Sequence, residues 1–308
     1  MGVVILFLLF ILMFIAGMAL LRQGLFHSAG SSMKKQLEKM VGSPWKGFVS
    51  GCIAAAFLHS SSAVMVLTIG LISAGLLTFR QSIGIILGSN VGTTFTLELI
   101  TINIDFFIVP LAVTGAMLIA FNSSLFKNIG KVTFGIAAVF VAMRGFTFLA
   151  GPLTEFTSVE SLLQQMDSSH LCAILLAAAF TALIQSSTAM TGIVMGFLAQ
   201  ELMEFDTALA AMLGANIGTC ATALLASAGA GKEGHLTAYA HLWLNIGGAL
   251  AFLPLIDSYA AIAPLTAARP EVQLAHASVL YNLVSSIAVL PFADGFSRFI
   301  LKLHGRNQ

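Results

Sequence analysis

Two stretches of the sequence match each other at a constant offset of 126 residues. The first runs from Phe57 to Thr96 and the second from Leu183 to Thr222. Each carries three consecutive hydroxyl residues near its start and a Gly-x-Asn-x-Gly-Thr segment further along, with the asparagine 30 positions after the first hydroxyl. The two stretches align without a gap, so we interpret them as an internal duplication. The chain is therefore expected to fold as two similar units.

The composition indicates a membrane protein. Of the 308 residues, 58% are hydrophobic and only 9% are charged, whereas soluble domains carry roughly 25% charged residues. The class predicted is an all-α polytopic membrane protein. The net charge of +1 gives no basic surface for nucleic acid. The three cysteines show no metal-like spacing, and we interpret them as packed thiols.

The apolar stretches predict seven membrane spans and two re-entrant hairpins. The hairpins have polar tips at residues 59–62 and 185–188, and their arms are short for a bilayer. Glycine and asparagine are poor helix formers, so we expect broken helices at 79–102 and 207–228. The glycines of these segments could equally mark a close helix contact. The expected spans are residues 2–21, 79–102, 106–121, 129–150, 207–228, 236–255 and 272–296.

These segments divide the chain into residues 1–126, a second repeat at 127–256, and a C-terminal span and tail at 257–308. Each repeat crosses the membrane three times, so the second repeat is expected to be inverted relative to the first. Twelve of the 14 Lys and Arg residues then fall on one side, with Arg269 opposite and Arg144 inside a span. The positive-inside rule places the N-terminus outside and the C-terminus in the cytoplasm.

The chemistry of the tips favours a small oxyanion. Helix N-termini present free N–H groups and a partial positive charge, and the hydroxyl runs follow the hairpin turns directly. The tips contain no Lys or Arg, so a divalent anion would need a bound cation. Hydroxyl and amide oxygens, including those of Gln185, Asn90 and Asn216, are hard ligands that suit Na⁺. Serine and threonine in membrane helices also bond simply to their own backbone.

Other polar residues in the predicted spans are assigned smaller roles. Glu98 is either a functional carboxylate or a side chain that reaches water, and Arg144 is interpreted as an interface anchor. The pairs His241–Asn245 and His276–Asn282 are interpreted as hydrogen bonds between helices. No enzyme is predicted, because His59 beside Ser60 lacks both a nucleophile elbow and an orienting acid.

The two tips carry a resemblance to a known family. The runs His59-Ser60-Ser61-Ser62 and Gln185-Ser186-Ser187-Thr188, each followed by Gly-x-Asn-x-Gly-Thr, resemble the duplicated Gln-Ser-Ser-Ser motif of the type II sodium–phosphate cotransporters, which include bacterial Na/Pi cotransporters. The resemblance covers nearly the whole chain. His59 stands where the family has Gln, and Thr188 replaces the last Ser.

The resemblance implies a secondary active transporter that couples Na⁺ movement to inorganic phosphate transport across the bilayer. It implies an elevator-like movement, a homodimer, and no cofactor beyond Na⁺ as coupling ion. The short loops favour a bacterial plasma (inner) membrane. The implied phosphate-binding residues are Ser60, Ser61, Ser62, Ser186, Ser187 and Thr188. The implied sodium-binding residues are Gln185, Ser186, Asn90, Thr93, Asn216 and Thr219.

Three alternatives to this function stay open, and the first of them rests on His59. A histidine offers no amide oxygen to a cation, and its proton can exchange near neutral pH. Coupling to H⁺ or pH sensing through His59 is therefore one alternative to Na⁺ coupling. Transport of another small oxyanion is the second, and a passive anion channel is the third.

Overall fold

The computed structural model describes residues 2–39 and 43–305, which form helices joined by short turns without any strand. Six helical segments of this described part are long and apolar enough to cross a membrane. They are Gly2–His27, Phe79–Ile100, Ser124–Thr154, Phe205–Ser227, Gly231–Leu265 and Pro270–His304. The all-helical, multi-pass membrane fold expected from the sequence is confirmed.

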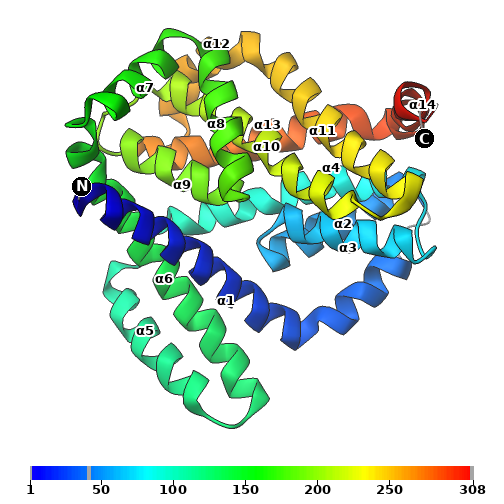
Figure 1. Ribbon diagram of the computed structural model, residues 1–308, viewed down its shortest axis with the longest axis horizontal. Coiled ribbons are helices and arrows are strands. Elements are labelled where there is room, and N and C mark those ends of the chain that lie inside the picture. The colour runs from blue at the N-terminus through cyan, green and yellow to red at the C-terminus, as the bar shows by residue number, and fades with distance from the viewer. Residues whose placement is uncertain (1, 40–42, 306–308) are drawn as a thin grey trace.

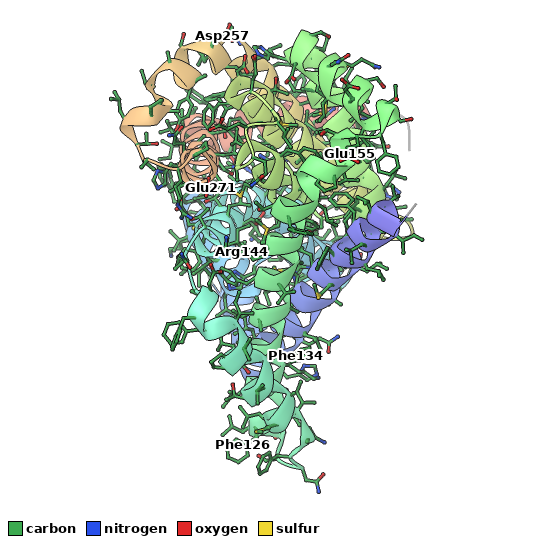
Figure 2. The ribbon with its side chains drawn as sticks, turned by 90° about the vertical axis from the view of Figure 1, so that its left-hand side faces the viewer. Phe126, Phe134, Arg144, Glu155, Asp257 and Glu271 are labelled. Atoms are coloured by element: carbon green, nitrogen blue, oxygen red, sulfur yellow. The ribbon has the colours of Figure 1, made fainter. Side chains whose placement is uncertain are left out.

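The seventh expected span, 106–121, forms a shorter helix. Helix α5 (Asp105–Ala120) has 16 residues, which rise about 24 Å against a hydrocarbon core of about 30 Å. It packs on α6 (Ser124–Thr154), and the two form a hairpin that projects from the rest of the molecule (Figure 1). Figure 2 places Phe126 near the tip of this projection. Helix α1 (Gly2–Lys39) runs along α6.

Helix starts recur at the offset seen in the sequence. Four helices of the first half each begin 126 residues before a helix of the second half, so the two halves share a pattern of local folding signals. The helices are α2 (Pro44–Leu58) and α8 (His170–Ile184), α3 (Ser61–Ser73) and α9 (Ser187–Leu198), α4 (Phe79–Ile100) and α10 (Phe205–Ser227), and α5 and α11 (Gly231–Phe252).

Serine N-caps explain part of this recurrence. Ser43 precedes α2, and its side chain accepts a hydrogen bond from the N–H of Lys46. Ser169 precedes α8 and accepts in the same way from Cys172. A cap of this kind satisfies an N–H group that the helix itself cannot pair. The starts of the first hairpin arms are thus fixed by local chemistry.

The remaining helices lie in the loops and at the C-terminal end. Helix α7 (Thr157–Ser168) lies between α6 and α8, and a short α12 (Ile256–Ile262) follows α11. The expected C-terminal span is α13 (Pro270–Val289), which continues through a 3₁₀ turn into α14 (Ala293–His304). Short 3₁₀ turns also flank α12, at Leu253–Leu255 and Ala263–Leu265.

The prediction of broken helices at 79–102 and 207–228 is wrong. Helices α4 and α10 run without interruption through their glycine segments. A side chain at Gly88 would collide with the backbone carbonyl of Phe48, and one at Gly214 with that of Ile174. These glycines therefore let α2 cross α4, and α8 cross α10, at very close range. The helix-contact reading of the Gly-x-x-x-G spacing accounts for them.

Apolar packing fixes the second arms of both hairpins. Phe14 of α1 and Phe146 of α6 share a buried cluster with Met195 of α9 and Leu209 of α10. A second cluster joins α3 to α4, α11 and α14; its buried members are Met65, Ile69, Phe79, Ile83, Ile86, Leu87, Ala223, Leu236, Ala238, Ala240, Leu290, Ala293 and Ile300. Helix α9 is therefore buried along most of its length, whereas α3 packs one side inward and leaves Val66 exposed on the other.

Candidate functional site

The two hairpin tips have the same backbone geometry. His59 ends α2 with φ of 50°, and Gln185 ends α8 with φ of 56°. Among the described residues only Glu201 shares this left-handed conformation outside glycine. Backbone of this kind is uncommon for side chains with a Cβ and gathers at functional sites. Each tip turns the chain sharply into the next helix.

The residue after each turn caps the second arm of its hairpin. The Ser60 side chain accepts from the N–H of Ala63 at 3.1 Å, and that of Ser186 accepts from Ala189 at 3.2 Å. The first N–H groups of a helix have no partner within it. The caps satisfy one such group at each tip, which leaves the earlier N–H groups of α3 and α9 outside the helical ladder. They are a ready anion-binding feature.

A small polar cavity joins the two halves of the molecule. It holds about 20 Å³ of free space, room for about one water molecule. Side chains from six helices line it, including the second arms of both hairpins. The lining residues are Ser61, Asn90, Thr93, Thr94, Leu97, Ser187, Thr188, Thr191, Asn216, Thr219, His241, Asn245, Ser278 and Asn282.

Seven residues singled out from the sequence line this cavity together: Ser61, Asn90, Thr93, Ser187, Thr188, Asn216 and Thr219. Five others lie outside its lining: His59, Ser60, Ser62, Gln185 and Ser186. Ser60 and Ser186 are the helix caps, Ser62 is half-buried, and Gln185 is exposed. The structure thus brings together hydroxyls of both tips with both motif asparagines, although the two segments are far apart in sequence.

His59 points to a different place. Its ring Nδ1 lies 3.0 Å from the Thr96 hydroxyl, and the ring stacks on Phe95. It borders a separate, apolar pocket between α1, α4 and α6. Arg22 of α1 donates a hydrogen bond to the His59 carbonyl at 3.2 Å. The His59 side chain thus does not line the polar cavity, because Thr96 and Phe95 hold the ring on the other side of the tip.

The cavity is polar but uncharged. No Asp, Glu, Lys or Arg is among its lining residues. The hydroxyls of Thr93 and Thr219 donate to the carbonyls of Ser89 and Ala215 four residues earlier, at 2.8 and 2.9 Å. Their oxygens therefore keep lone pairs, but no hydrogen, for a ligand. This arrangement favours a cation at those two positions.

Helices α11 and α13 contribute His241, Asn245 and Asn282, which the sequence analysis assigned only to hydrogen bonding between helices. They also contribute Ser278, which the sequence analysis did not single out. His241 and Asn245 lie one turn apart on α11, as do Ser278 and Asn282 on α13, and all four line the cavity. The Asn245 amide accepts from Asn90 at 3.4 Å. The sequence signal was the spacing of four residues between polar side chains, which places both members of a pair on one helix face.

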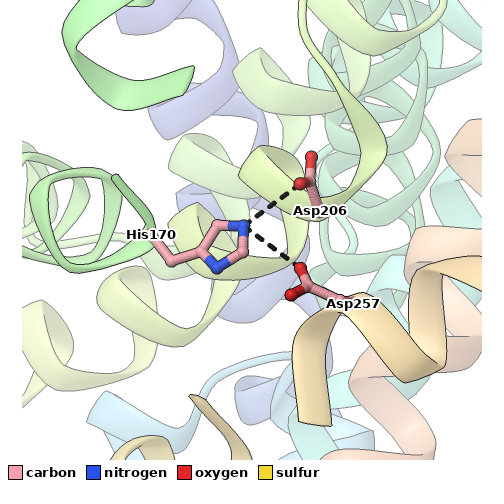
Figure 3. A group of neighbouring side chains, drawn as sticks. All are labelled: His170, Asp206 and Asp257. Atoms are coloured by element: carbon pink, nitrogen blue, oxygen red, sulfur yellow. Dashed lines mark hydrogen bonds and ion pairs between the residues drawn. The ribbon is translucent and has the colours of Figure 1, made fainter. Parts of the chain in front are cut away.

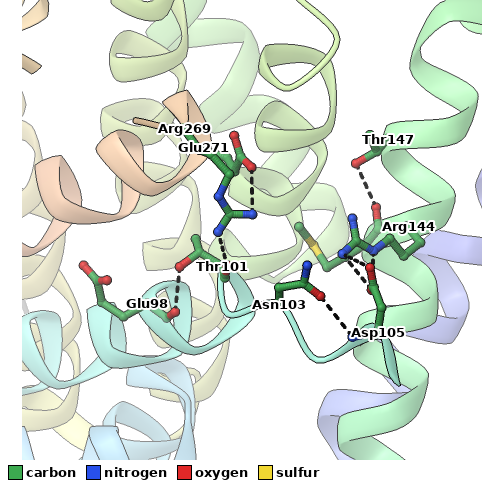
Figure 4. Close-up of polar contacts among 9 residues, drawn as sticks. Glu98, Thr101, Asn103, Asp105, Arg144, Thr147, Arg269 and Glu271 are labelled. Carbon is green, nitrogen blue, oxygen red and sulfur yellow. Dashed lines mark hydrogen bonds and ion pairs between the residues drawn. The ribbon is translucent and has the colours of Figure 1, made fainter. Parts of the chain in front are cut away.

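The charged residues near the C-terminal end of α4 form ion pairs and hydrogen bonds away from the cavity. Arg144 forms a double hydrogen bond with Asp105, both contacts being 2.7 Å (Figure 4). Arg269 donates to the carbonyl of Thr101 at 2.5 Å. The carboxylate of Glu98 lies 3.6 Å from His276. Arg144 is thus a half-exposed ion-pair partner away from the polar cavity, and Glu98 also does not line it.

A second titratable cluster joins the starts of three helices (Figure 3). His170 of α8 lies 3.1 Å from Asp206 of α10 and 3.7 Å from Asp257 of α12. Both aspartates sit in the first turn of their helices, where the helix dipole stabilises negative charge. These contacts hold the starts of α8, α10 and α12 together, which accounts for the cluster. Asp257 is largely exposed.

The fold and the cavity define the class of protein: a multi-pass helical membrane protein with an uncharged polar site between two hairpin tips. Comparison with known proteins gives the family. The sequence model described as Na⁺/Pi-cotransporter matches residues 13–147 and 153–265. The chain belongs to the Na⁺/Pi-cotransporter family, which is a family of transporters and not a class of enzymes.

Individual relatives are bacterial. The chain is 36% identical over 290 residues to "Uncharacterized protein YqeW" of Bacillus subtilis, covering 94% of each chain. It is 25% identical over 285 residues to "Putative inorganic phosphate export protein YjbB" of Escherichia coli K12, covering 92% of this chain and 52% of that protein. The chain therefore spans about half the length of YjbB. No solved structure matches the chain.

Proposed function

We propose that this protein carries inorganic phosphate across the membrane by binding it in the polar cavity between the two hairpin tips. The observation that supports this most directly is the meeting of Ser61 with Ser187 and Thr188 in one cavity. These residues begin α3 and α9, so hydroxyls and helix N-termini of both halves converge there. Two such N-termini together supply roughly one positive charge.

Sodium is the proposed coupling ion. Because no charged side chain lines the cavity, a phosphate dianion there needs a cation for balance. Thr93 and Thr219 offer oxygen lone pairs, and Asn90 and Asn216 offer amide oxygens, which are hard ligands suited to Na⁺. Gln185 and Ser186 remain predicted sodium ligands, and the exposed position of Gln185 means that its tip must move to contribute.

The proposed mechanism is alternating access by two inverted repeats. The shared helix starts support two repeats at residues 1–126 and 127–256, followed by 257–308. The charge distribution supports an outside N-terminus and a cytoplasmic C-terminus. The helical hairpins, with arms of 12 to 15 residues, are proposed to enter and leave the membrane from one side. The small cavity fits an occluded state. We propose that the hairpins move in an elevator-like manner. We further propose that the protein is a homodimer in the bacterial inner membrane.

The decisive experiment is phosphate transport in proteoliposomes. We expect radiolabelled phosphate to move when an inward or outward Na⁺ gradient is imposed, and not when choline replaces Na⁺. A pH gradient imposed alone should give little transport. Transport driven by the pH gradient alone would replace Na⁺ by H⁺, and equal movement without any gradient coupling would indicate a passive channel. Empty liposomes and the Ser61→Ala/Ser187→Ala double variant serve as controls.

The sodium assignment has its own test. Thr93→Val and Thr219→Val remove a ligand oxygen but keep the side-chain shape, so the Na⁺ concentration for half-maximal transport should rise several-fold. Thr133→Val on α6 is a matched control, because that hydroxyl also bonds back to its own helix but lies outside the cavity. Unchanged Na⁺ dependence in both cavity variants would remove these two residues from the site.

A further inference from the structure

One histidine of the chain has an unpaired buried ring atom. Six of the seven histidines have a ring nitrogen near a polar partner. The partners are the carbonyl of Gln23 for His27, Thr96 for His59, Asp206 for His170, the carbonyl of Gly231 for His235, Glu98 for His276 and Trp243 for His304. His241 is 1% exposed, and its Nδ1 atom has no hydrogen-bond partner among the described residues. Buried polar atoms are nearly always paired, and among the described residues with an unpaired buried side-chain atom, His241 is the one that also lines the polar cavity.

His241 is held in place by its backbone, which leaves the ring uncommitted. Its carbonyl oxygen accepts from the Asn245 amide at 2.9 Å and from the Cys220 thiol at 3.6 Å. Asn245 in turn is joined to Asn90 of α4. The residue therefore sits at a fixed point where α4, α10 and α11 meet, and its side chain lines the polar cavity.

The other cavity residues do not supply the missing partner. No described polar atom lies within hydrogen-bond distance of His241 Nδ1, and no carboxylate lines the cavity to pair with the ring. A sodium ion prefers oxygen ligands over an imidazole nitrogen. A phosphate oxygen is a strong acceptor and suits a ring N–H.

We propose that His241 is a substrate-binding residue whose ring N–H donates a hydrogen bond to the transported phosphate. This inference rests on the proposed function of the same cavity. It adds a donor from α11 to those of the two tips, so that the anion is bound from a third side. It also makes His241, and not His59, the histidine in contact with substrate.

The test compares three variants in proteoliposomes by the KM for phosphate and the maximal rate. His241→Leu removes the donor, and loss of a hydrogen bond to a charged group is expected to raise KM about 10- to 100-fold. His241→Gln restores an N–H donor and should return KM to within a few-fold of the original. His235→Gln is the matched control, because His235 lies on the same helix and bonds to Gly231 outside the cavity.

A folding defect is separated from lost binding by thermal unfolding in detergent. The phosphate-induced rise in Tm, measured in saturating Na⁺, should be present in the unmodified protein and in His235→Gln but absent in His241→Leu. If the unmodified protein transports phosphate and His241→Leu keeps its KM and its Tm response, the inference is overturned and the proposed function stands. An unmodified protein that neither binds nor transports phosphate overturns both.

Discussion

The two hairpin tips have the same backbone conformation but differ in their contacts with neighbouring helices. Both turn through a left-handed residue and both are capped by serine. At the first tip, His59 is buried, bonded to Thr96 and held at its carbonyl by Arg22. At the second tip, Gln185 is exposed. The residue 126 positions after Thr96 is Thr222, whose hydroxyl oxygen is buried without a partner among the described residues.

This difference indicates that one side of each tip binds the ligand, while the opposite side determines how firmly the tip is attached to neighbouring helices. The cavity side of each tip carries the same chemistry, since Ser61 and Ser187 both line it. The opposite side is bonded to α1 and α4 in the first half, whereas Gln185 at the corresponding place in the second half is exposed. We infer that the duplicated motif conserves the ligand-facing surface within this chain, while the back of the tip is where the two halves diverge. The predictions below test that division, beginning with the largest expected effect.

The first prediction is that the cavity sides are equivalent. Ser61→Ala and Ser187→Ala each remove one hydroxyl donor to the anion. Each should lower the ratio of the maximal transport rate to the KM for phosphate about tenfold or more. The double variant should lose roughly the product of the two effects. The measurement is initial phosphate uptake at fixed Na⁺ gradient. A large effect at one tip and none at the other would place the anion against a single hairpin.

The second prediction is that Arg22 fastens the first tip alone. Arg22→Met removes a charged donor to the His59 carbonyl, so amide hydrogen exchange of residues 59–61 should speed up about tenfold. Exchange at residues 185–187 should stay unchanged. Phe148→Met is the matched control, since Phe148 occupies the position 126 residues later and is 74% exposed. Faster exchange at both tips would show that the tips are coupled.

The third prediction concerns the side chains at the turns. His59→Ala leaves the Thr96 hydroxyl without its partner and should reduce the free energy of unfolding by about 1–3 kcal/mol. Gln185→Ala alters an exposed side chain and should change it by no more than about 0.5 kcal/mol. The left-handed backbone cost is common to both and cancels in the comparison. Equal losses, measured by denaturant unfolding in detergent, would contradict the asymmetry.

The fourth prediction is that the serine N-caps of the two tips contribute equally to stability. Ser60→Ala and Ser186→Ala each remove an N-cap, which costs about 1 kcal/mol of stability. The two losses should agree closely, because the cap distances are 3.1 and 3.2 Å. The check is a pair of unfolding curves recorded under identical conditions. A clear inequality would show that tertiary contacts, and not the local cap, set the stability of the turn.

The sequence alone determined the features that depend on local chemistry. Low charge and long apolar stretches specified a multi-pass helical membrane protein, because the bilayer leaves few other solutions. The serine caps fixed where α3 and α9 begin, since a cap acts on N–H groups two or three residues away. The matching offset also placed Ser61, Asn90, Ser187 and Asn216 in one candidate site, and the structure brings these four together.

Only the tertiary structure decided what depends on a neighbour distant in sequence. Helices α4 and α10 stay continuous because the carbonyls of Phe48 and Ile174 pack where a Cβ would be. The direction of His59 was settled by Thr96, which lies 37 residues further along the chain. His241 joined the site because α11 packs against α4 and α10. No local pattern encodes these contacts, since each depends on the distance and angle at which two packed helices cross.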